Sequence, residues 1–355
     1  MRDNRSPLDF LRELVELESP TGNTSVMCER MADELGALGG TPTREGEHLR
    51  ADFPGDGAPL VLLGHLDTVW PGGTLATMPW RVEGDRAYGP GSYDMKGGLV
   101  VMLEAIRISG PRRALRVVLT ADEEIGSPSA RDTLARAAAG AAAAFVCEPP
   151  TSRGDLKTAR KGIGRFTLRV KGRAAHSAEP RRGVSAIEEL ARLTLTLHAL
   201  NDGSSGITVN VGVISGGTRE NVVPAEATAL VDVRVPTLVE RERVDRILGE
   251  LEAESEGASV ELGGGWTRPP LERSPGAGVL FERAREHGRA LGLDLHEASV
   301  AGGSDGNLLG ALGVPVLDGL GAQGGGAHAA GEHVLVPSLD VRAQLLARIL
   351  RDPGV

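Results

Sequence analysis

The fold is decided by the stretch Leu60-Val61-Leu62-Leu63-Gly64-His65-Leu66-Asp67. It begins with a continuous apolar run, which is typical of a strand buried on both faces of a parallel sheet. His65 and Asp67 follow the run, and ligands of open α/β sheets collect at the carboxyl ends of the strands. The stretch therefore predicts an internal strand that brings a His-x-Asp pair to the functional edge of a sheet.

Helices and strands alternate on both sides of this strand. Ser6 and Pro7 form a good helix start, and apolar residues at helical spacing follow them. Apolar spacing predicts further helices over 25–38, 98–108, 129–138 and 279–291, and further strands over 115–119, 143–146 and 314–317. This alternation predicts an α/β domain with a mostly parallel sheet.

The pattern changes near Lys161, where apolar and polar residues begin to alternate with period two. The elements expected there are strands over 165–170, 208–213, 227–235 and 259–262, and helices over 186–200 and 239–254. This is a compact α+β pattern with a sheet that is open on one face. We therefore predict an α/β domain over 1–160 and 274–355, interrupted by a smaller α+β domain over 161–273.

Composition narrows the class of protein. The 355 residues are 41% hydrophobic and 25% charged, as expected for a globular protein of two domains. The net charge of -9 and the lack of a basic stripe argue against a nucleic-acid partner. The two cysteines, Cys28 and Cys147, do not suggest a disulfide framework, which favours a reducing compartment. A polar N-terminus and the absence of a long apolar run predict a cytoplasmic protein without a membrane partner.

Acidic residues and a second histidine follow other predicted strands or lie in glycine-rich loops. Asp94 precedes a helix, Glu123 and Glu124 end one strand, Glu148 ends another, and His328 follows the last strand. Each alone has a plain reading as a turn, a solvated acid or a loop histidine. Together they predict a metal centre, because catalytic zinc takes imidazole and carboxylate ligands and leaves room for water. Two histidines and three carboxylates suit two zinc ions that share one carboxylate.

Two residues beside the expected ligands suggest supporting roles. One of the adjacent Glu123 and Glu124 can bind metal while the other acts as a general base within reach of a water. Asp67 can accept a hydrogen bond from the ring nitrogen of His65 that does not bind metal. Such a contact would fix the tautomer and the orientation of the imidazole.

Four segments, taken in order, resemble a known group over nearly the whole chain. They are Gly64-His65-Leu66-Asp67-Thr68-Val69, Gly89-Pro90-Gly91-Ser92-Tyr93-Asp94-Met95-Lys96-Gly97-Gly98, Asp122-Glu123-Glu124-Ile125-Gly126-Ser127 and Gly302-Gly303-Ser304-Asp305-Gly306-Asn307. The group is the zinc-dependent peptidase superfamily of carboxypeptidase G, aminoacylase, acetylornithine deacetylase and succinyl-diaminopimelate desuccinylase. The resemblance implies two Zn²⁺ ions, or another divalent metal such as Co²⁺ or Mn²⁺. By this resemblance Asp94 bridges the ions, His65 and Glu148 complete one, Glu124 and His328 complete the other, Glu123 is the general base and Asp67 supports His65.

The inserted domain resembles the dimerisation lid of that superfamily, so a homodimer is expected. His176, in Gly172-Arg173-Ala174-Ala175-His176-Ser177, resembles a histidine that reaches the other subunit's active site and steadies the oxyanion there. Asn221 and Arg234 resemble lid residues that hold substrate, and an arginine fork suits a carboxylate. The plain alternative for Arg234 is a surface strand residue.

A loop near the end of the chain is a further candidate for substrate binding. Ser304 and Asn307 lie in the segment Gly302–Asn307, which resembles a loop that faces the substrate. A simple helix start at Ser304 or Asp305 competes with that interpretation.

Two features point to different branches of the superfamily. Asp318-Gly319-Leu320-Gly321 and Arg160–Phe166 resemble the glutamate-carboxypeptidase branch, whereas the three residues between His176 and Pro180 resemble the deacetylases and desuccinylases. The resemblance to the glutamate-carboxypeptidase branch implies a hydrolase that cleaves an amide next to a free carboxylate and releases a C-terminal amino acid such as glutamate. The alternatives are an N-acyl amino acid deacylase and a non-catalytic metal-binding scaffold. A dinucleotide-binding enzyme is disfavoured, because Gly-x-Gly-x-x-Gly does not follow the first strand.

Overall fold

The apolar run at Leu60 lies in β3 (Asp56–His65), an internal strand of a six-stranded sheet in the computed structural model. The strand order is β1-β2-β6-β3-β7-β14. β3 pairs in parallel with β6 (Arg113–Thr120) and β7 (Ala143–Val146), and β7 pairs in parallel with β14 (Val316–Leu317). The predicted α/β class with a mostly parallel sheet is confirmed.

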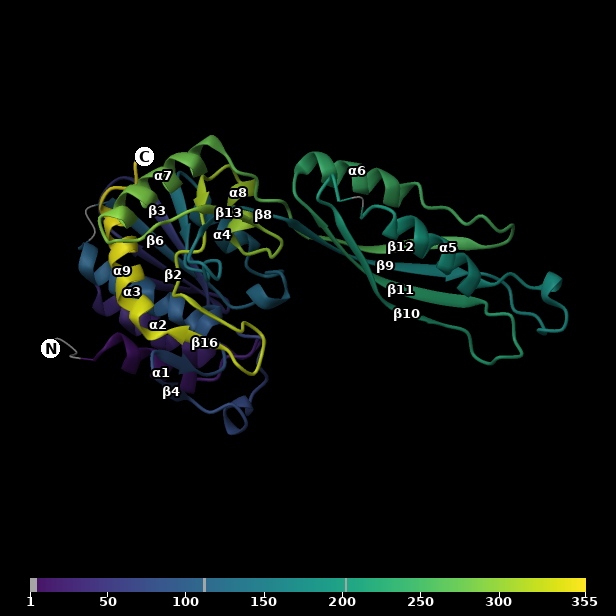
Figure 1. Ribbon diagram of the computed structural model, residues 1–355, viewed down its shortest axis with the longest axis horizontal. Helices are drawn as coiled ribbons and strands as arrows, with labels where there is room; N and C mark the ends of the chain where they lie inside the picture. The colour runs from purple at the N-terminus through teal and green to yellow at the C-terminus, as the bar shows by residue number, and fades with distance from the viewer. Residues whose placement is uncertain (1–4, 111–112, 202) are drawn as a thin grey trace. The chain divides into compact units, whose positions relative to one another are not determined.

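Both faces of this sheet are covered. Leu60 and Leu62 join the main apolar core, while Val61 and Leu63 are equally buried on the opposite face. The helices of this part are α1 (Pro7–Glu16), α2 (Ser25–Ala37), α3 (Gly97–Ser109), α4 (Arg131–Ala138), α7 (Pro275–Arg289), α8 (Gly306–Ala311) and α9 (Val336–Arg351) (Figure 1). α3 packs on α9, whereas α4 contacts β6 and α8 contacts β7. Residues 60–65 of β3 and all of β7 are buried, so side chains of these two strands can serve a site only from the strand ends.

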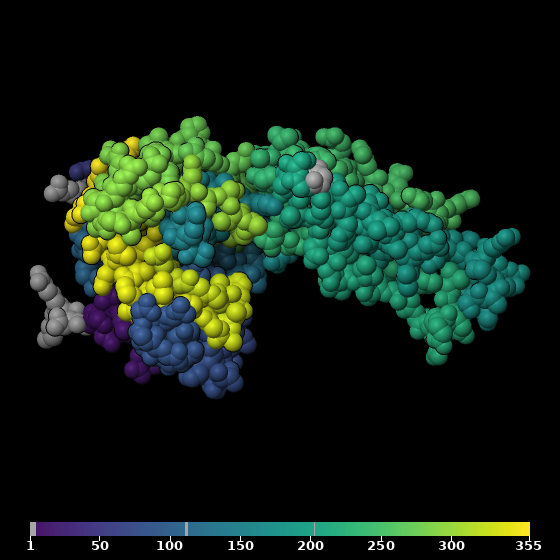
Figure 2. All heavy atoms as spheres, in the orientation of Figure 1, coloured from purple at the N-terminus to yellow at the C-terminus, as the bar shows by residue number. Residues whose placement is uncertain are grey.

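Several short strands escaped the sequence analysis. β1 (Thr41–Glu45) and β2 (His48–Phe53) form an antiparallel hairpin that joins the large sheet through β6. β1 (Thr-Pro-Thr-Arg-Glu) has no aliphatic or aromatic residue, and charged residues interrupt the apolar ones in β2, so no continuous run marks the hairpin. The other strands of this part are β4 (Arg81–Glu83), β5 (Arg86–Tyr88), β8 (Leu156–Arg160), β13 (Glu297–Val300), β15 (Gly324–Gly325) and β16 (His333–Leu335). β16 pairs with β5, and Figure 2 shows the yellow C-terminal segment beside the blue segment that contains β5.

The structure describes residues 5–110, 113–201 and 203–355, which form two units. Unit 1 comprises Met1–Ala159, Arg273–Val300 and Ser304–Val355; unit 2 comprises Arg160–Glu272 and Ala301–Gly303. In the described part of the chain, no helix combines the length and apolar character that crossing a membrane requires. Both cysteines are buried free thiols.

Unit 2 is an antiparallel sheet with two helices. Its elements are β9 (Gly162–Lys171), α5 (Ala186–His198), β10 (Thr208–Gly216), β11 (Glu226–Val235), α6 (Leu238–Gly249) and β12 (Ser259–Arg268). The strand order is β10-β11-β9-β12, and alternate residues such as Phe166, Leu168 and Val170 pack in a core with the helices. The helix predicted over 239–254 ends early, at Gly249. The chain then turns, and the backbone N–H groups of Glu254 and Ser255 bond the Glu189 carboxylate.

Candidate metal centre

His65 stands at the end of β3, level with Glu148, the second residue after β7. Leu63 pairs with Val146 in the parallel ladder, so two further residues along each strand bring His65 beside Glu148. The His65 Nε2 atom lies 3.5 Å from Glu148 Oε1 and 3.2 Å from Asp94 Oδ1. The imidazole is buried, so these carboxylates are its immediate surroundings.

Asp94 faces two histidines at once. It lies in the loop before α3, with non-helical φ and ψ of -114° and 96°. Its Oδ1 lies 3.2 Å from His65 Nε2, and its Oδ2 lies 3.3 Å from His328 Nε2. One carboxylate with an oxygen directed at each of two imidazoles has the arrangement that a bridging ligand needs.

Glu124 is a second carboxylate beside the Nε2 atom of His328. It lies in the short turn after β6, and its Oε2 is 3.3 Å from His328 Nε2. Its Oε1 is buried and has no hydrogen-bond partner among the described residues. Leaving a buried carboxylate oxygen unpaired is costly, so this atom calls for a cation or a water. The His328 side chain is half exposed, which leaves one side of the cluster open to solvent.

The spacing of these atoms fits metal coordination. Ligand atoms held about 2.1 Å from a tetrahedral zinc ion stand about 3.4 Å apart, and the pairs here are separated by 3.2–3.5 Å. Two groups have ligand atoms within 4.8 Å of one another: His65 with Asp94 and Glu124, and His65 with Glu123 and Glu148. The residues present therefore fit the coordination of metal, and the two groups have His65 in common.

The electrostatics favour added positive charge. Hydrogen bonds that the His328 ring donates to the carboxylates of Asp94 and Glu124 raise its pKa to about 10. Burial alone would lower the pKa of His65, but Asp67 and Asp94 outweigh it and raise that pKa. Burial would raise the pKa of Asp94, but His328 and His65 outweigh it and lower that pKa. The cluster thus stabilises protonated imidazoles, and a divalent cation that displaces those protons would meet the same field.

Asp67 plays a wider part than the sequence predicts. The His65 Nδ1 atom lies 2.9 Å from the backbone oxygen of Asp67 and 3.4 Å from its Oδ1, so the backbone is the nearer partner. The carboxylate accepts N–H bonds from Glu123 (3.1 Å) and Glu124 (3.2 Å) and the hydroxyl of Thr21 (2.7 Å). Asp67 therefore also fixes the turn that carries the two glutamates. No sequence signal marks Thr21.

The loop at 304–307 has internal partners. Ser304 and Asn307 are fully buried; the Ser304 hydroxyl donates to Asp318, and the Ser304 N–H donates to the Asn307 side chain. Neither side chain reaches solvent in this conformation. The adjacent Asp305 accepts the hydroxyl of Thr120 at 2.6 Å and also bonds the hydroxyl of Ser127. The loop thus braces the strand end from which the Glu123-Glu124 turn departs.

The remaining predicted residues lie in unit 2. His176 forms a bridge with Val222, and Ser177 N–H donates to the backbone oxygen of Asn221, so His176 and Asn221 lie on adjacent segments. Arg234 bonds the Asp232 carboxylate through Nε at 2.9 Å and the backbone oxygen of Ala301 at 2.9 Å. Sequence analysis did not foresee the Asp232 pairing, although the two residues share a strand face at a spacing of two.

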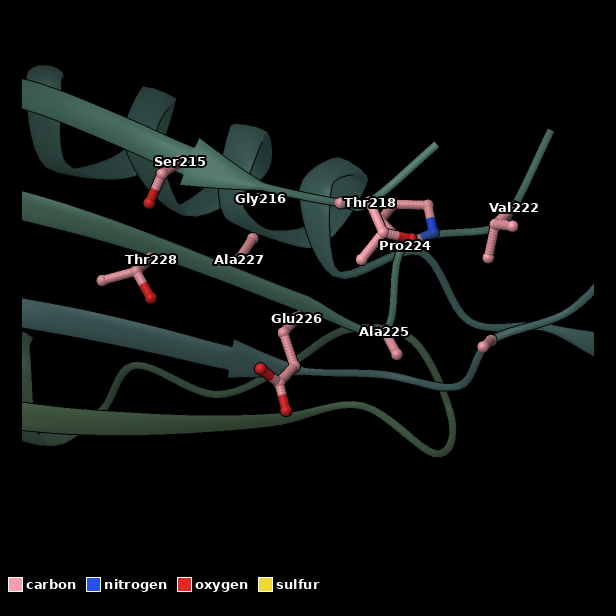
Figure 3. A pocket seen from close by; sticks show the side chains of 11 residues that line it. Ser215, Gly216, Thr218, Val222, Pro224, Ala225, Glu226, Ala227 and Thr228 are labelled. Atoms are coloured by element: carbon pink, nitrogen blue, oxygen red, sulfur yellow. The ribbon is translucent and has the colours of Figure 1, made fainter. Parts of the chain in front are cut away.

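Unit 2 also contains a hollow of about 460 Å³. Figure 3 shows side chains around it from the end of β10 and the start of β11, including Ser215, Glu226 and Thr228. Val222 borders it, so the hollow adjoins the segment that carries Asn221. None of the predicted metal ligands lines this hollow.

This α/β sheet, with histidines and carboxylates at its carboxyl edge, has the arrangement of a metallohydrolase. Residues 61–352 match the model of "Peptidase family M20/M25/M40". Carboxypeptidase G2 of Pseudomonas sp. (strain RS-16) is 32% identical over 97% of this chain and 88% of that protein. The chain therefore belongs to peptidase family M20 and is a metallopeptidase-family hydrolase similar to carboxypeptidase G2.

Two further relatives show the breadth of the likeness. A succinyl-diaminopimelate desuccinylase of Thioalkalivibrio sulfidiphilus is 28% identical over 97% of this chain and 98% of that protein. The crystal structure of aminopeptidase PepT from Bacillus cereus has a TM-score of 0.84 at 22% identity and covers 98% of both chains. The second likeness supports the fold alone, because its identity is low. The family and fold expected from the sequence are thus confirmed.

Proposed function

We propose that this protein is a di-metal hydrolase that cleaves an amide next to a free carboxylate and releases a C-terminal amino acid such as glutamate. The observation that carries the proposal is Asp94, whose two oxygens lie 3.2 and 3.3 Å from the Nε2 atoms of His65 and His328. The 32% identity to carboxypeptidase G2 supports the carboxypeptidase branch.

In this proposal the chain holds two Zn²⁺, Co²⁺ or Mn²⁺ ions through five side chains: His65, Asp94, Glu124, Glu148 and His328. The ions would supply Lewis-acid polarisation of the scissile carbonyl and activation of water. Glu123 would take the proton from that water and return it to the leaving amine. Its position supports this role, since its carboxylate lies within 4.8 Å of the ligand atoms of His65 and Glu148.

Residues of unit 2 complete the proposal. His176 would donate to the developing oxyanion in the active site of a partner subunit, with Asn221 beside it, so the active form would be a homodimer. Arg234 would bind the substrate carboxylate, for which Asp232 holds the guanidinium in place at 2.9 Å. Because Ser304 and Asn307 are buried, we assign their loop a supporting role around the Glu123-Glu124 turn.

The proposal is tested by amine release from zinc-loaded protein. Acyl-glutamates and dipeptides that end in glutamate are compared with N-acetyl and N-succinyl amino acids at equal concentration. We expect release chiefly from the glutamate series. Release chiefly from the N-acyl series would instead establish a deacylase with the same metal centre.

The deacylase is the second candidate, and two observations favour it. The desuccinylase of Thioalkalivibrio sulfidiphilus aligns with 97% of this chain. The three residues between His176 and Pro180 also resemble the spacing of that branch. Both proposed reactions use the same ions and the same base. They differ in the part of the substrate that the enzyme recognises, which is the C-terminal amino acid in one and the acyl group in the other.

A further inference from the structure

Glu332 is a fully buried carboxylate with four N–H donors around it. Its Oε1 accepts from the backbone N–H of Tyr93 at 3.0 Å and of Asp94 at 2.9 Å. Its Oε2 accepts from the backbone N–H of Gly91 at 3.0 Å and from the indole N–H of Trp70 at 2.7 Å. Three of the four donors thus belong to the loop that presents Asp94.

The chemistry of this arrangement requires a carboxylate. An ionised carboxylate has two acceptor oxygens with about four lone-pair sites, and each oxygen of Glu332 here accepts two bonds. A glutamine of the same shape would place an NH₂ group against two N–H donors. Gly91, with a φ of 69°, lets the loop turn its N–H groups inward, which makes a nest for an anion.

Glu332 also lies on the segment that carries His328. Turn bonds run from Ala329 N–H to Gly326 O and from Glu332 N–H to Ala329 O, so the four-residue path to His328 is itself ordered. The next residue, His333, pairs with Tyr88 in the β16–β5 ladder. One carboxylate therefore joins two loops that each supply a proposed metal ligand.

We infer that Glu332 is a positioning residue that holds the Asp94 loop against the His328 segment, so that both oxygens of Asp94 face their histidines before metal binds. The inference rests on the proposed metal centre. The Glu332 carboxylate accepts from the backbone N–H of Asp94 and so acts on this proposed ligand through its backbone. Partners of this kind, one step removed from the ions, strongly influence metal affinity.

A purely structural role is the competing explanation, and unit 2 offers a matched control. Glu189 is also fully buried and accepts backbone N–H bonds, from Glu254 at 2.6 Å and Ser255 at 3.2 Å. Glu189→Gln removes a carboxylate of the same kind in unit 2, which contains none of the proposed ligands. A general loss of stability should therefore appear in both variants, and a loss of metal affinity only in Glu332→Gln.

The experiment is a zinc titration of the metal-free full-length protein against a chromophoric chelator. We expect Glu332→Gln to bind at least one of two zinc ions about 10- to 100-fold more weakly than the wild type. Glu189→Gln should match the wild type in both steps. Cobalt absorption spectra of the two variants give a second readout that does not depend on activity.

Each outcome decides the inference. Equal zinc affinities and cobalt spectra in wild type and Glu332→Gln would overturn it. If Glu332→Gln does not fold, Trp70→Phe removes one of the four bonds; we expect a few-fold weaker zinc binding, and unchanged binding would overturn the inference. A wild type that binds two zinc ions but hydrolyses no amide would sink the proposed function and leave this inference standing. A wild type that binds no zinc would overturn both.

Discussion

Charged side chains are arranged differently at the carboxyl edge of the large sheet in unit 1 and on the sheet of unit 2. At the edge, Asp94, Glu124 and Glu148 gather around two histidines, and Glu124 Oε1 has no partner among the described residues. In unit 2, Arg234 pairs with Asp232 on the same strand. Converging carboxylates and imidazoles offer ligands to a cation, whereas the paired Arg234 and Asp232 balance each other's charge.

A chelator should therefore lower the stability of unit 1 and leave that of unit 2 unchanged. We expect removal of metal to abolish hydrolysis and re-addition of zinc to restore it. Unit 1 should also lose stability, because a ligand at 1,000 times its Kd stabilises the folded state by about 4 kcal/mol. Calorimetry with and without chelator checks this: the transition of unit 1 should shift and that of unit 2 should not. Full activity after exhaustive chelation would show that the carboxyl edge of unit 1 does not hold a catalytic metal.

At the carboxyl edge, substitution of Glu123 should affect the catalytic step and leave metal binding unchanged. Glu123→Gln should lower kcat by about 10²–10⁴-fold, because a positioned general base contributes that much. Zinc affinity, measured by the same competitive titration, should change little. Glu282→Gln, on the exposed surface of α7, is the control. Unchanged activity in Glu123→Gln would revive the interpretation of the protein as a metal-binding scaffold.

Arg234 tests the functional part of unit 2. Arg234→Ala should raise KM about 10- to 100-fold for substrates with a free carboxylate, since a bond between charged groups contributes about 1.5–3 kcal/mol. Substrates whose carboxylate is amidated should not distinguish the variant from the wild type. Zinc affinity should be unaffected. An equal rise in KM for both substrate types would mean that Arg234 supports the structure and does not bind the substrate carboxylate.

The smallest expected effect concerns the pH stability of unit 2. Burial would raise the pKa of Glu189, but the N–H groups of Glu254 and Ser255 outweigh it and lower that pKa. The resulting stabilisation is present above the ordinary glutamate pKa of about 4.3 and is lost as pH falls through the lower folded-state value. Glu189→Gln should cost about 1–3 kcal/mol at neutral pH. Denaturant unfolding at pH 7 and pH 3 should show the difference shrinking in acid; a pH-independent difference would contradict this.

Features that depend on a repeating pattern of apolar residues could be predicted from the sequence. The apolar run at 60–63 indicated a buried strand, and the acids after the strands that end at Thr120 and Val146 indicated a candidate site, because residues 60–65 and β7 are buried up to the strand ends. The hairpin of β1 and β2 was missed because β1 lacks aliphatic and aromatic residues and charged residues interrupt the apolar ones in β2. The end of α6 was predicted five residues too late, since Glu189 redirects the chain from a distant helix.

Contacts between distant segments were beyond the sequence. Asp67 was expected to serve His65, but its hold on the backbone of Glu123 and Glu124 depends on β3 and β6 lying side by side. Glu332 follows His328 in an ordinary loop, and no pattern links it to Trp70 or to Asp94. Such roles follow from three-dimensional proximity and leave no periodic trace in one sequence.

The position of His328 has a consequence for the order in which the site is built. The other proposed ligands lie between His65 and Glu148, and unit 2 separates them from His328 along the chain. During synthesis, the ribosome releases His328 and Glu332 only after the whole of unit 2. A nascent chain therefore cannot bring His328 to Asp94 and Glu124 until the last segment has been made and has paired with β5.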